Sequence, residues 1–368
     1  MKKKNLLYAF VLSVAITNSV CGQQMKLWYT QAAANWNEAL PVGNGRLAAM
    51  VFGGAANERI QLNEETVWAG EPGNNIPEGT YDSIQRIRQL LFSGKYKEAQ
   101  DLSNSTFPRQ APANSNYGMQ YQPVGNLQLQ FDISGVVTDY YRDLDIANAI
   151  ATVRFKAGDI HYQREIFASL TDGVIVIRLT ADKPKSINCT LSTNTLHKTK
   201  LVTVRQQELI LTGTTSSADN KTGRINFESQ FHPLCEGGRL VTTDSTVRIE
   251  HADAATIYIS IATNYKTYKD ISGDPSARAS GYMKAATNKA YGKLKADHIA
   301  AYKKYFDRVS LELGNTAQAA KPTDVRIAEF NSQHDPGTGI SLFSIWQIPV
   351  DLRFSAGFST YEPTGQVE

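Results

Sequence analysis

The sequence predicts a mainly β protein built around a large antiparallel β-sandwich, and three observations support this fold class. From Met25 to Tyr268, short runs rich in Val, Ile, Leu, Phe and Tyr are separated by Gly, Asn, Asp and Pro. Residues 127–131 read Leu-Gln-Leu-Gln-Phe, a strict alternation typical of a half-buried strand. Many such runs follow one another along this stretch, which favours two large packed sheets.

The individual elements follow from these patterns. The clearest strand candidates are residues 47–52, 127–131, 151–155, 174–179, 209–211 and 256–262. One helical insertion interrupts them. Its apolar positions are Ile84, Ile87, Leu90 and Leu91, followed by Tyr96, Ala99 and Leu102 in a second short helix. We expect Asp82 or Ser83 to cap the first helix and Gly94 to end it.

After Asp274-Pro275 the composition changes from strand-like to helical. One apolar face is formed by Met283, Ala286, Ala290, Leu294, Tyr302, Phe306 and Val309. We expect this helical region to be broken near Asp297 and to be followed by a short strand at 310–314. Pro322-Thr323 then opens another helix, with Ile327 and Phe330 facing inward.

The first 22 residues have the layout of a secretory signal peptide. Lys2, Lys3 and Lys4 precede a short apolar stretch at 6–16, and Cys21 and Gly22 supply small residues for cleavage. The mature protein is therefore expected in the periplasm or outside the cell. Lipid anchoring at Cys21 is the less favoured alternative, because Val20 is larger than the residue usual there. No later run of eighteen apolar residues predicts a transmembrane segment.

Charge and metal-ligand spacing exclude several function classes. The chain has 38 Lys and Arg against 35 Asp and Glu, and loss of the three N-terminal lysines leaves 35 of each sign. A nucleic-acid binder is therefore not expected. The six histidines show no i, i+4 pair, so neither a metal site nor a cofactor is predicted. Cys189 and Cys235 could form a disulfide or remain two separate thiols.

Residues 43–48 read Gly-Asn-Gly-Arg-Leu-Ala, which matches a dinucleotide fingerprint on paper, with Glu64 and Glu65 some twenty residues further on. The context is wrong, because a strand-like run follows the glycines where a helix is needed. We expect instead a turn that brings the backbone close to a neighbouring segment.

Acidic and aromatic residues are concentrated near the N-terminus. Glu38, Glu58, Glu64 and Glu65 could include a general acid and base, since a glycosidase needs two carboxyls flanking the scissile bond. The local sequence does not place them as such a pair, which favours salt-bridged or partly exposed glutamates. The aromatic residues are Trp28, Tyr29, Trp36 and Trp68. Aromatic faces stack on sugar rings, but core packing is the default interpretation.

Three segments resemble the opening of glycoside hydrolase family 95, the inverting α-L-fucosidases: residues 36–47 (WNEALPVGNGRL), 49–54 (AMVFGG) and 58–64 (ERIQLNE). Further matches follow in order. They are Tyr121 with 123–127, residues 141–145, Tyr162 with Arg164-Glu165, residues 262–265, His298 with Tyr302, Phe306 and Arg308-Val309, and residues 322–327 with Asp335-Pro336. The resemblance covers residues 26–336.

The resemblance implies an N-terminal sandwich of the super-sandwich type, a helical linker, and an (α/α)₆ barrel that holds the catalytic carboxylates and activating asparagines. The predicted domains are a signal peptide (1–22), the sandwich (23–273), the linker (274–336) and a tail (337–368). The barrel is expected to be missing, so no catalytic residue is assigned in this chain. The candidates for facing the barrel or bordering its pocket are Trp36, Glu38, Asn44, Arg46 and Trp68.

The tail at 337–368 no longer resembles the family, and the codons suggest why. Read one nucleotide later, residues 345–351 can encode Phe-Gly-Arg-Tyr-Leu-Leu-Ile, and residues 360–368 can encode Thr-Asn-Leu-Gln-Gly-Lys-Trp. Both peptides resemble the start of the family's barrel, which predicts a frameshift. Without a barrel, the linker is expected to expose an apolar, poorly soluble patch. Its residues are Met283, Leu294, Phe306, Ile327 and Phe330.

Two functions remain open at this stage. The first is the sandwich and linker of an exo-α-L-fucosidase that releases terminal fucose from a fucosylated glycan or oligosaccharide, with L-galactose as an alternative sugar. The second is a non-catalytic carbohydrate-binding or scaffold sandwich. Binding of a glycan without turnover would favour the second.

Overall fold

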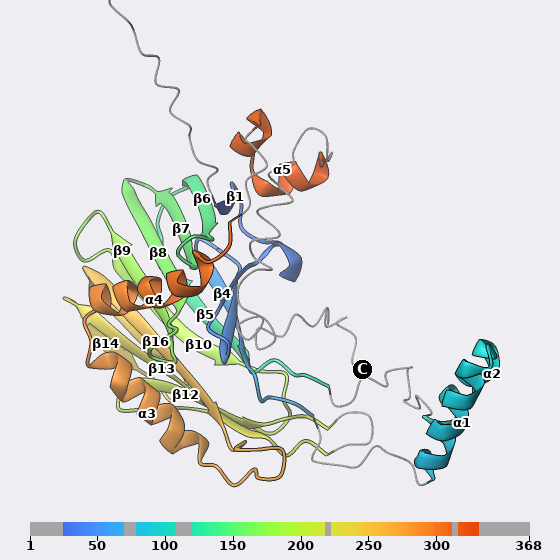
Figure 1. Ribbon diagram of the computed structural model, residues 1–368. Coiled ribbons are helices and arrows are strands. Elements are labelled where there is room, and N and C mark those ends of the chain that lie inside the picture. The colour runs from blue at the N-terminus through green and yellow to red at the C-terminus, as the bar shows by residue number, and fades with distance from the viewer. Residues whose placement is uncertain (1–24, 70–78, 108–119, 218–221, 311–315, 331–368) are drawn as a thin grey trace, which may run out of the picture.

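The computed structural model describes residues 25–69, 79–107, 120–217, 222–310 and 316–330. Two antiparallel sheets lie face to face and form the predicted sandwich (Figure 1). The expected signal peptide (1–22), the tail (337–368) and most of the expected strand at 310–314 lie outside the described residues. Within the described ranges, no helix combines the length and the apolar character that crossing a bilayer requires.

The larger sheet has nine strands. In spatial order they are β1 (Lys26–Tyr29), β6 (Val137–Asp145), β7 (Ile150–Ala157), β8 (Ile160–Ala168), β9 (Ile175–Ala181), β16 (Ala254–Thr263), β13 (Asn226–Glu236), β12 (Glu208–Thr214) and β11 (Lys200–Arg205).

The smaller sheet has seven strands. In spatial order they are β14 (Arg239–Thr242), β15 (Val247–Ala252), β10 (Ile187–Asn194), β5 (Gly125–Phe131), β4 (Asn57–Glu64), β3 (Leu47–Val51) and β2 (Leu40–Gly43). Each of the six strand predictions coincides with one of the observed strands, because alternating or continuous apolar runs pack well on a pleated, buried face.

One continuous apolar core fills the space between the two sheets. Leu62 and Leu127 from the smaller sheet meet Ile177 and Ile259 from the larger one, and all four side chains are fully buried. Cys189 is buried in this core, whereas Cys235 is only partly buried. Both are free thiols, so the alternative of two separate cysteines is the one observed.

The linker helices pack on the outer face of the nine-stranded sheet (Figure 1). They are α3 (Pro275–Thr287) and α4 (Tyr291–Phe306). Met283 and Leu294 are 4% and 0% exposed and belong to a second apolar cluster with Phe167, Val176 and Tyr258 of the sheet. The expectation that these two residues need a barrel to be buried is therefore wrong. The outward-facing apolar residues of the sheet cover them instead.

Other details of the linker also differ from expectation. The helical region breaks between Thr287 and Tyr291, ahead of the expected position near Asp297. After the short helix η3 (Ala317–Ala320), α5 (Thr323–Ala328) begins at the predicted Pro322-Thr323. Ile327 and Phe330 do not face inward, because each is 50% exposed, which agrees with the exposure expected of these two residues without a barrel. Phe306 is partly buried against the main core.

The predicted helical insertion is a hairpin of α1 (Thr80–Phe92) and α2 (Tyr96–Thr106), which stands apart from the sheets in Figure 1. Gly94 lies between the two helices with a φ of 72°, as expected for a residue that ends a helix. The capping prediction is wrong, because α1 begins at Thr80 and Asp82 already lies in its first turn. Within the hairpin, Leu90 and Ala99 are buried.

His298 fixes the position of α4 on the sheet. Its side chain is fully buried, its ring stacks on Phe167 with centroids 4.9 Å apart, and its Nε2 lies 3.1 Å from the carbonyl oxygen of Asn148. Burial lowers the pKa of His298, and the hydrogen bonds to the Ala149 and Asn148 carbonyls act in the opposite direction. The imidazole is therefore neutral in the folded protein at neutral pH.

Truncation of a buried side chain in the linker helices should destabilise the protein. We expect Leu294→Ala to lower the free energy of unfolding by about 2–5 kcal/mol, because it leaves a cavity under α4. The control Ile327→Ala, at a half-exposed position, should cost less than about 1 kcal/mol. Urea unfolding followed by circular dichroism measures both. Equal losses in the two variants would contradict the described packing of α4.

Acid should destabilise the protein through His298. Because its pKa is lower in the folded than in the unfolded state, the unfolded state binds more protons below about pH 6.5. Stability should therefore fall as the pH drops from 7.5 to 5.5, by at most about 1.4 kcal/mol per pH unit for one histidine. His298→Gln should be less stable at pH 7.5 and should show a flatter pH dependence. The control Ile327→Ala removes no titratable group and should keep the wild-type slope, and an unchanged slope in His298→Gln would refute the assignment.

Candidate functional site

Asn44 shapes the turn between β2 and β3. Its Oδ1 accepts hydrogen bonds from the backbone N–H groups of Arg46 and Leu47, at 3.1 and 2.7 Å, and its Nδ2 donates to the carbonyl of Ser169 at 2.8 Å. Gly45 has a φ of 95°, which glycine adopts without strain. The predicted turn is confirmed. Strands flank it on both sides, so a dinucleotide site, which needs a helix there, is excluded.

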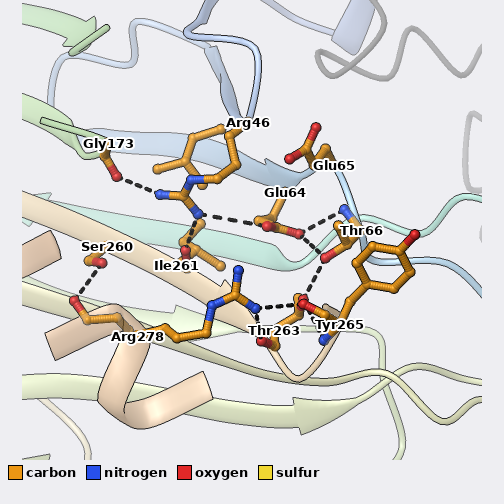
Figure 2. Close-up of polar contacts among 12 residues, drawn as sticks. Arg46, Glu64, Glu65, Thr66, Gly173, Ser260, Ile261, Thr263, Tyr265 and Arg278 are labelled. Atoms are coloured by element: carbon orange, nitrogen blue, oxygen red, sulfur yellow. Dashed lines mark hydrogen bonds and ion pairs between the residues drawn. The ribbon is translucent and has the colours of Figure 1, made fainter. Parts of the chain in front are cut away.

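Arg46 lies at the centre of the network drawn in Figure 2. Its Nη1 donates to the carbonyl of Ile261 at 2.5 Å and its Nη2 to the carbonyl of Gly173 at 2.6 Å. The guanidinium also lies 4.2 Å from the ring centroid of Tyr282 on α3. One side chain of the smaller sheet therefore contacts β16, the β8–β9 loop and α3. Only a planar, multiply donating group can make these contacts together.

Glu64, at the end of β4, lies beside Arg46 and is almost fully buried. Its Oε1 lies 3.7 Å from Arg46 Nη1, and its Oε2 accepts hydrogen bonds from the N–H and the hydroxyl of Thr66, at 2.8 and 2.6 Å. Burial raises the pKa of Glu64, while Thr66 and Arg46 oppose that rise. This carboxylate is fully occupied by protein groups, which favours a structural role.

The network continues to the first linker helix (Figure 2). The hydroxyls of Thr66 and Thr263 lie 2.5 Å apart, and Arg278 of α3 donates to the carbonyls of Thr263 and Tyr265 at 2.7 and 2.6 Å. Sequence patterns gave no signal for Arg278 or Tyr282, because Arg278 binds backbone carbonyls, which no side-chain pattern reports, and Tyr282 contacts Arg46, which is remote in the chain. They dock the start of α3 onto this end of the sandwich.

The β8–β9 loop is held from the other side by the linker. Asp172 is buried, accepts a hydrogen bond from the Ser169 hydroxyl at 2.7 Å, and is paired with Lys289, which lies between α3 and α4. Burial alone would raise the pKa of Asp172, but the hydrogen bonds from Lys289 and Ser169 outweigh it, so the pKa is lowered. The β8–β9 loop, whose carbonyls accept hydrogen bonds from Asn44 and Arg46, is therefore itself held in place by the linker.

Trp68 is an exposed aromatic side chain at this end, with 41% of its surface accessible. Its indole N–H donates to the carbonyl of Glu65 at 2.7 Å, and its ring meets Tyr121 edge-on, with centroids 5.1 Å apart. Tyr121 in turn donates to the Glu64 carbonyl at 3.3 Å. The Glu65 carboxylate is exposed beside it. An oriented indole next to a free carboxylate is chemically suited to a sugar, which combines an apolar C–H face with hydroxyls.

Trp36 and Glu38 lie elsewhere, in the short helix η1 (Trp36–Glu38) that precedes β2. Trp36 packs against the small cluster of Ala39, Met50 and Phe52. The Glu38 carboxylate accepts hydrogen bonds from the Ala34 N–H at 2.8 Å and the Asn35 amide at 2.7 Å. The four residues of β2 separate this pair from Asn44, so the structure divides the five candidate residues into two groups.

Glu58 is part of a buried ion pair. Its Oε2 accepts from Arg164 Nη1 at 2.9 Å and its Oε1 from the Gly53 N–H at 2.8 Å, while Arg164 also donates to the carbonyls of Gly54 and Ala55. Burial raises the pKa of Glu58, and the charge of Arg164 and the Gly53 N–H oppose that rise. Arg142 makes a parallel contribution, donating to the carbonyls of Gln31 and Glu38.

The described residues therefore hold no acid–base pair formed from the four N-terminal glutamates. Glu58 and Glu64 bind arginines, Glu38 closes a local turn and Glu65 alone is free, which confirms the prediction of salt-bridged or partly exposed glutamates. In the same described ranges, no three His, Cys, Asp or Glu side chains are grouped as metal ligands. This end of the molecule is equipped to contact a sugar or another domain.

Two family models match the chain, one after the other. "Glycosyl hydrolase family 65, N-terminal domain" matches residues 27–268, which is more than half of the chain. "Glycosyl hydrolase family 95 catalytic domain" matches residues 290–345, beginning at α4 and running past residue 336 into the region expected to be a tail.

Curated relatives have related names. "Alpha-L-fucosidase 2" of Arabidopsis thaliana is 28% identical over 351 residues, covering 87% of this chain and 41% of the relative. "Probable alpha-fucosidase A" of Aspergillus niger is 26% identical over 325 residues, covering 81% and 39%. The chain thus spans about two fifths of the length of these relatives.

Solved structures show weaker likeness. A putative kojibiose phosphorylase from the human microbiome has a TM-score of 0.45 and 10% identity, covering 77% of this chain and 39% of that one. A family GH92 alpha-mannosidase from Bacteroides thetaiotaomicron has a TM-score of 0.27 and 8% identity, covering 76% and 36%.

Loss of the Glu58 charge should destabilise the fold strongly. We expect Glu58→Gln to lower the free energy of unfolding by about 3–5 kcal/mol, because it leaves the Arg164 guanidinium buried without its counter-charge. The matched control is Glu236→Gln, which removes a mostly exposed carboxylate paired with Arg178 and should cost less than about 1 kcal/mol. Chemical denaturation of both variants measures the difference, and comparable losses would contradict the buried-pair assignment.

Proposed function

The chain belongs to the glycosyl hydrolases that carry a family 65-type N-terminal domain and continue into a family 95 catalytic domain, and on this premise we propose that it is the sandwich and linker part of an exo-acting, inverting α-L-fucosidase. The observation that supports this most directly is the order of the two matches. The second begins in α4, the helix that packs on the sandwich of the first. The relatives named as fucosidases support fucose as the sugar.

The proposed reaction releases terminal fucose from a glycan. An inverting glycosidase protonates the leaving oxygen with one carboxylic acid, while a second carboxylate activates water on the opposite face, about 6.5–9.5 Å away. None of the four N-terminal glutamates is assigned to either role. The proposal assigns both roles to the catalytic domain that follows the linker in the relatives. L-galactose remains an alternative sugar within this proposal.

Within this proposal, Trp68 and Glu65 border the sugar pocket and Arg46 and Asn44 support it. The indole is exposed and oriented by two contacts, whereas the Arg46 guanidinium is fully engaged by protein carbonyls. Trp36 and Glu38 then have a structural role at the opposite end of β2.

We also propose that residues 1–22 direct export, which places the enzyme in the periplasm or outside the cell, where fucosylated glycans are available as substrate. Lipid attachment at Cys21 is the variant of this proposal that keeps the enzyme on a membrane surface.

The proposed activity can be measured on a hybrid. Residues 23–345 are joined to the remainder of a family 95 catalytic domain, and NMR follows an aryl α-L-fucoside. We expect release of fucose with the β-anomer appearing first, as inversion requires. A hybrid that unfolds cooperatively but releases no fucose would contradict the proposal, and binding without turnover would favour the non-catalytic alternative.

The role of Trp68 is tested in the same hybrid. Trp68→Ala should lower kcat/KM on a fucosylated oligosaccharide by about tenfold, because a lost aromatic–sugar contact removes about 1–1.5 kcal/mol. The control is Tyr305→Ala, which removes an aromatic side chain near the C-terminal end of α4 that is 49% exposed. Equal kcat/KM for the Trp68 variant and its parent would exclude Trp68 from the pocket.

A further inference from the structure

The outer face of the nine-stranded sheet is divided into an apolar and a polar half. Helices α3 and α4 cover the apolar half, where Phe167, Val176 and Tyr258 face outward. Further along the same strands, the outward positions carry Arg154, His161 and other polar residues instead. This change coincides with the edge of the area that α3 and α4 cover, so the polar half forms a separate surface.

The strand register aligns four of these residues in one row. Tyr141 pairs with Arg154, Arg154 with Gln163, and Gln163 with Thr180, across β6, β7, β8 and β9. Directly paired residues on one face are neighbours, and adjacent strands are about 4.8 Å apart, so the row is about 14 Å long. That length matches a short oligosaccharide lying across the strands.

A cavity of about 350 Å³, within the usual size of ligand sites, is lined by three members of this row, Arg154, Gln163 and Thr180. Its polar lining includes Asp139, Arg154, His161, Gln163 and Asp182. The register of β6 shifts between Thr138 and Tyr141, and Asp139 adopts a φ of 51°, which is unusual for a residue other than glycine. Bulges of this kind re-aim side chains and are common beside binding sites.

The groups around the cavity are oriented but retain free hydrogen-bonding capacity. Asp182 accepts from the His161 backbone at 2.9 Å and pairs with its Nδ1 at 2.7 Å, which fixes the imidazole. Arg154 lies 5.2 Å from the Tyr141 ring centroid and, within the described part of the chain, makes no hydrogen bond or ion pair. A guanidinium close to an aromatic ring, with its N–H groups unoccupied by the protein, can donate hydrogen bonds to a ligand.

The aromatic end of the row continues onto β1. Trp28 stacks on Tyr141 with centroids 5.8 Å apart and planes inclined by 25°, and Lys26 donates to the Tyr141 hydroxyl at 3.1 Å. Both rings are only partly buried. Around the cavity, Arg154 carries one positive charge and Asp139 and Asp182 carry two negative ones, so the lining disfavours an anionic saccharide and suits a neutral one.

This surface is separate from the Arg46 network. Gly173, which contacts Arg46, precedes β9, whereas Asp182 follows it. The seven residues of β9 place about 20 Å between them. A ligand at one end therefore does not occupy the other.

We propose that the row Tyr141–Arg154–Gln163–Thr180, with its cavity, is a second saccharide-binding site that takes a neutral oligosaccharide. It would hold the glycan chain to the sandwich while the chain's end is processed elsewhere, which raises the local substrate concentration. Only the choice of a fucosylated probe rests on the proposed function.

The test uses the chain itself, so it does not depend on any fucosidase activity. Saturation-transfer NMR and calorimetry with 2′-fucosyllactose should show binding, and lactose serves as the unfucosylated comparison. Arg154→Ala and Gln163→Ala should each raise the dissociation constant by about fivefold, the effect of one lost hydrogen bond. Both side chains lie on the sheet surface, so the variants should fold, which circular dichroism checks.

The matched control is Lys198→Ala, which removes an exposed positive charge elsewhere in the chain. It should bind like the parent. Absence of binding for both saccharides would overturn the proposal, as would equal affinity in Arg154→Ala and Lys198→Ala. Binding that persists in a chain whose hybrid releases no fucose would support this site while rejecting the proposed activity.

Discussion

The guanidinium of Arg46 joins parts of the molecule that the chain alone would leave independent. It extends from the β2–β3 turn of the smaller sheet to carbonyls at Gly173 and Ile261 in the larger one, and it stacks on Tyr282 of α3. Each contact uses a different edge or face of the same planar group, so no other side chain could replace it. The docking of α3 on this end of the sandwich depends on this arrangement.

Two further buried arginines also join separate segments of the sandwich. Arg164 and Arg142 cross the core and bind the carbonyls of loops that precede β2 and β4. Buried charges require such partners, because an unpaired one is costly. Arg142 and Arg164, which lie in segments that resemble the glycosidase family, thus have a structural role in this fold.

The strands were predictable because apolar alternation reports burial directly. The Gly43–Arg46 turn was predictable because a strand-like run, and not a helix, follows its glycines. The surface on which the linker helices pack was not predictable. Met283 and Leu294 signal that a helix has an apolar face, but the sequence does not say which surface receives it. The site was predicted only in part, because Arg46 reaches the Ile261 carbonyl, 215 positions further along the chain, and no local pattern reports such a contact. The cross-strand row from Tyr141 to Thr180 depends on register, which alternation alone does not fix.

We expect the linker helices and the sandwich to unfold as one cooperative unit. The direct measurement is calorimetric unfolding of residues 23–330 beside residues 23–273. We expect a single transition for the longer chain and a lower midpoint for the shorter one, because removal of α3 and α4 exposes the cluster around Phe167 and leaves Arg46 without Tyr282. Two separate transitions in the longer chain, or identical midpoints for both, would contradict the claim.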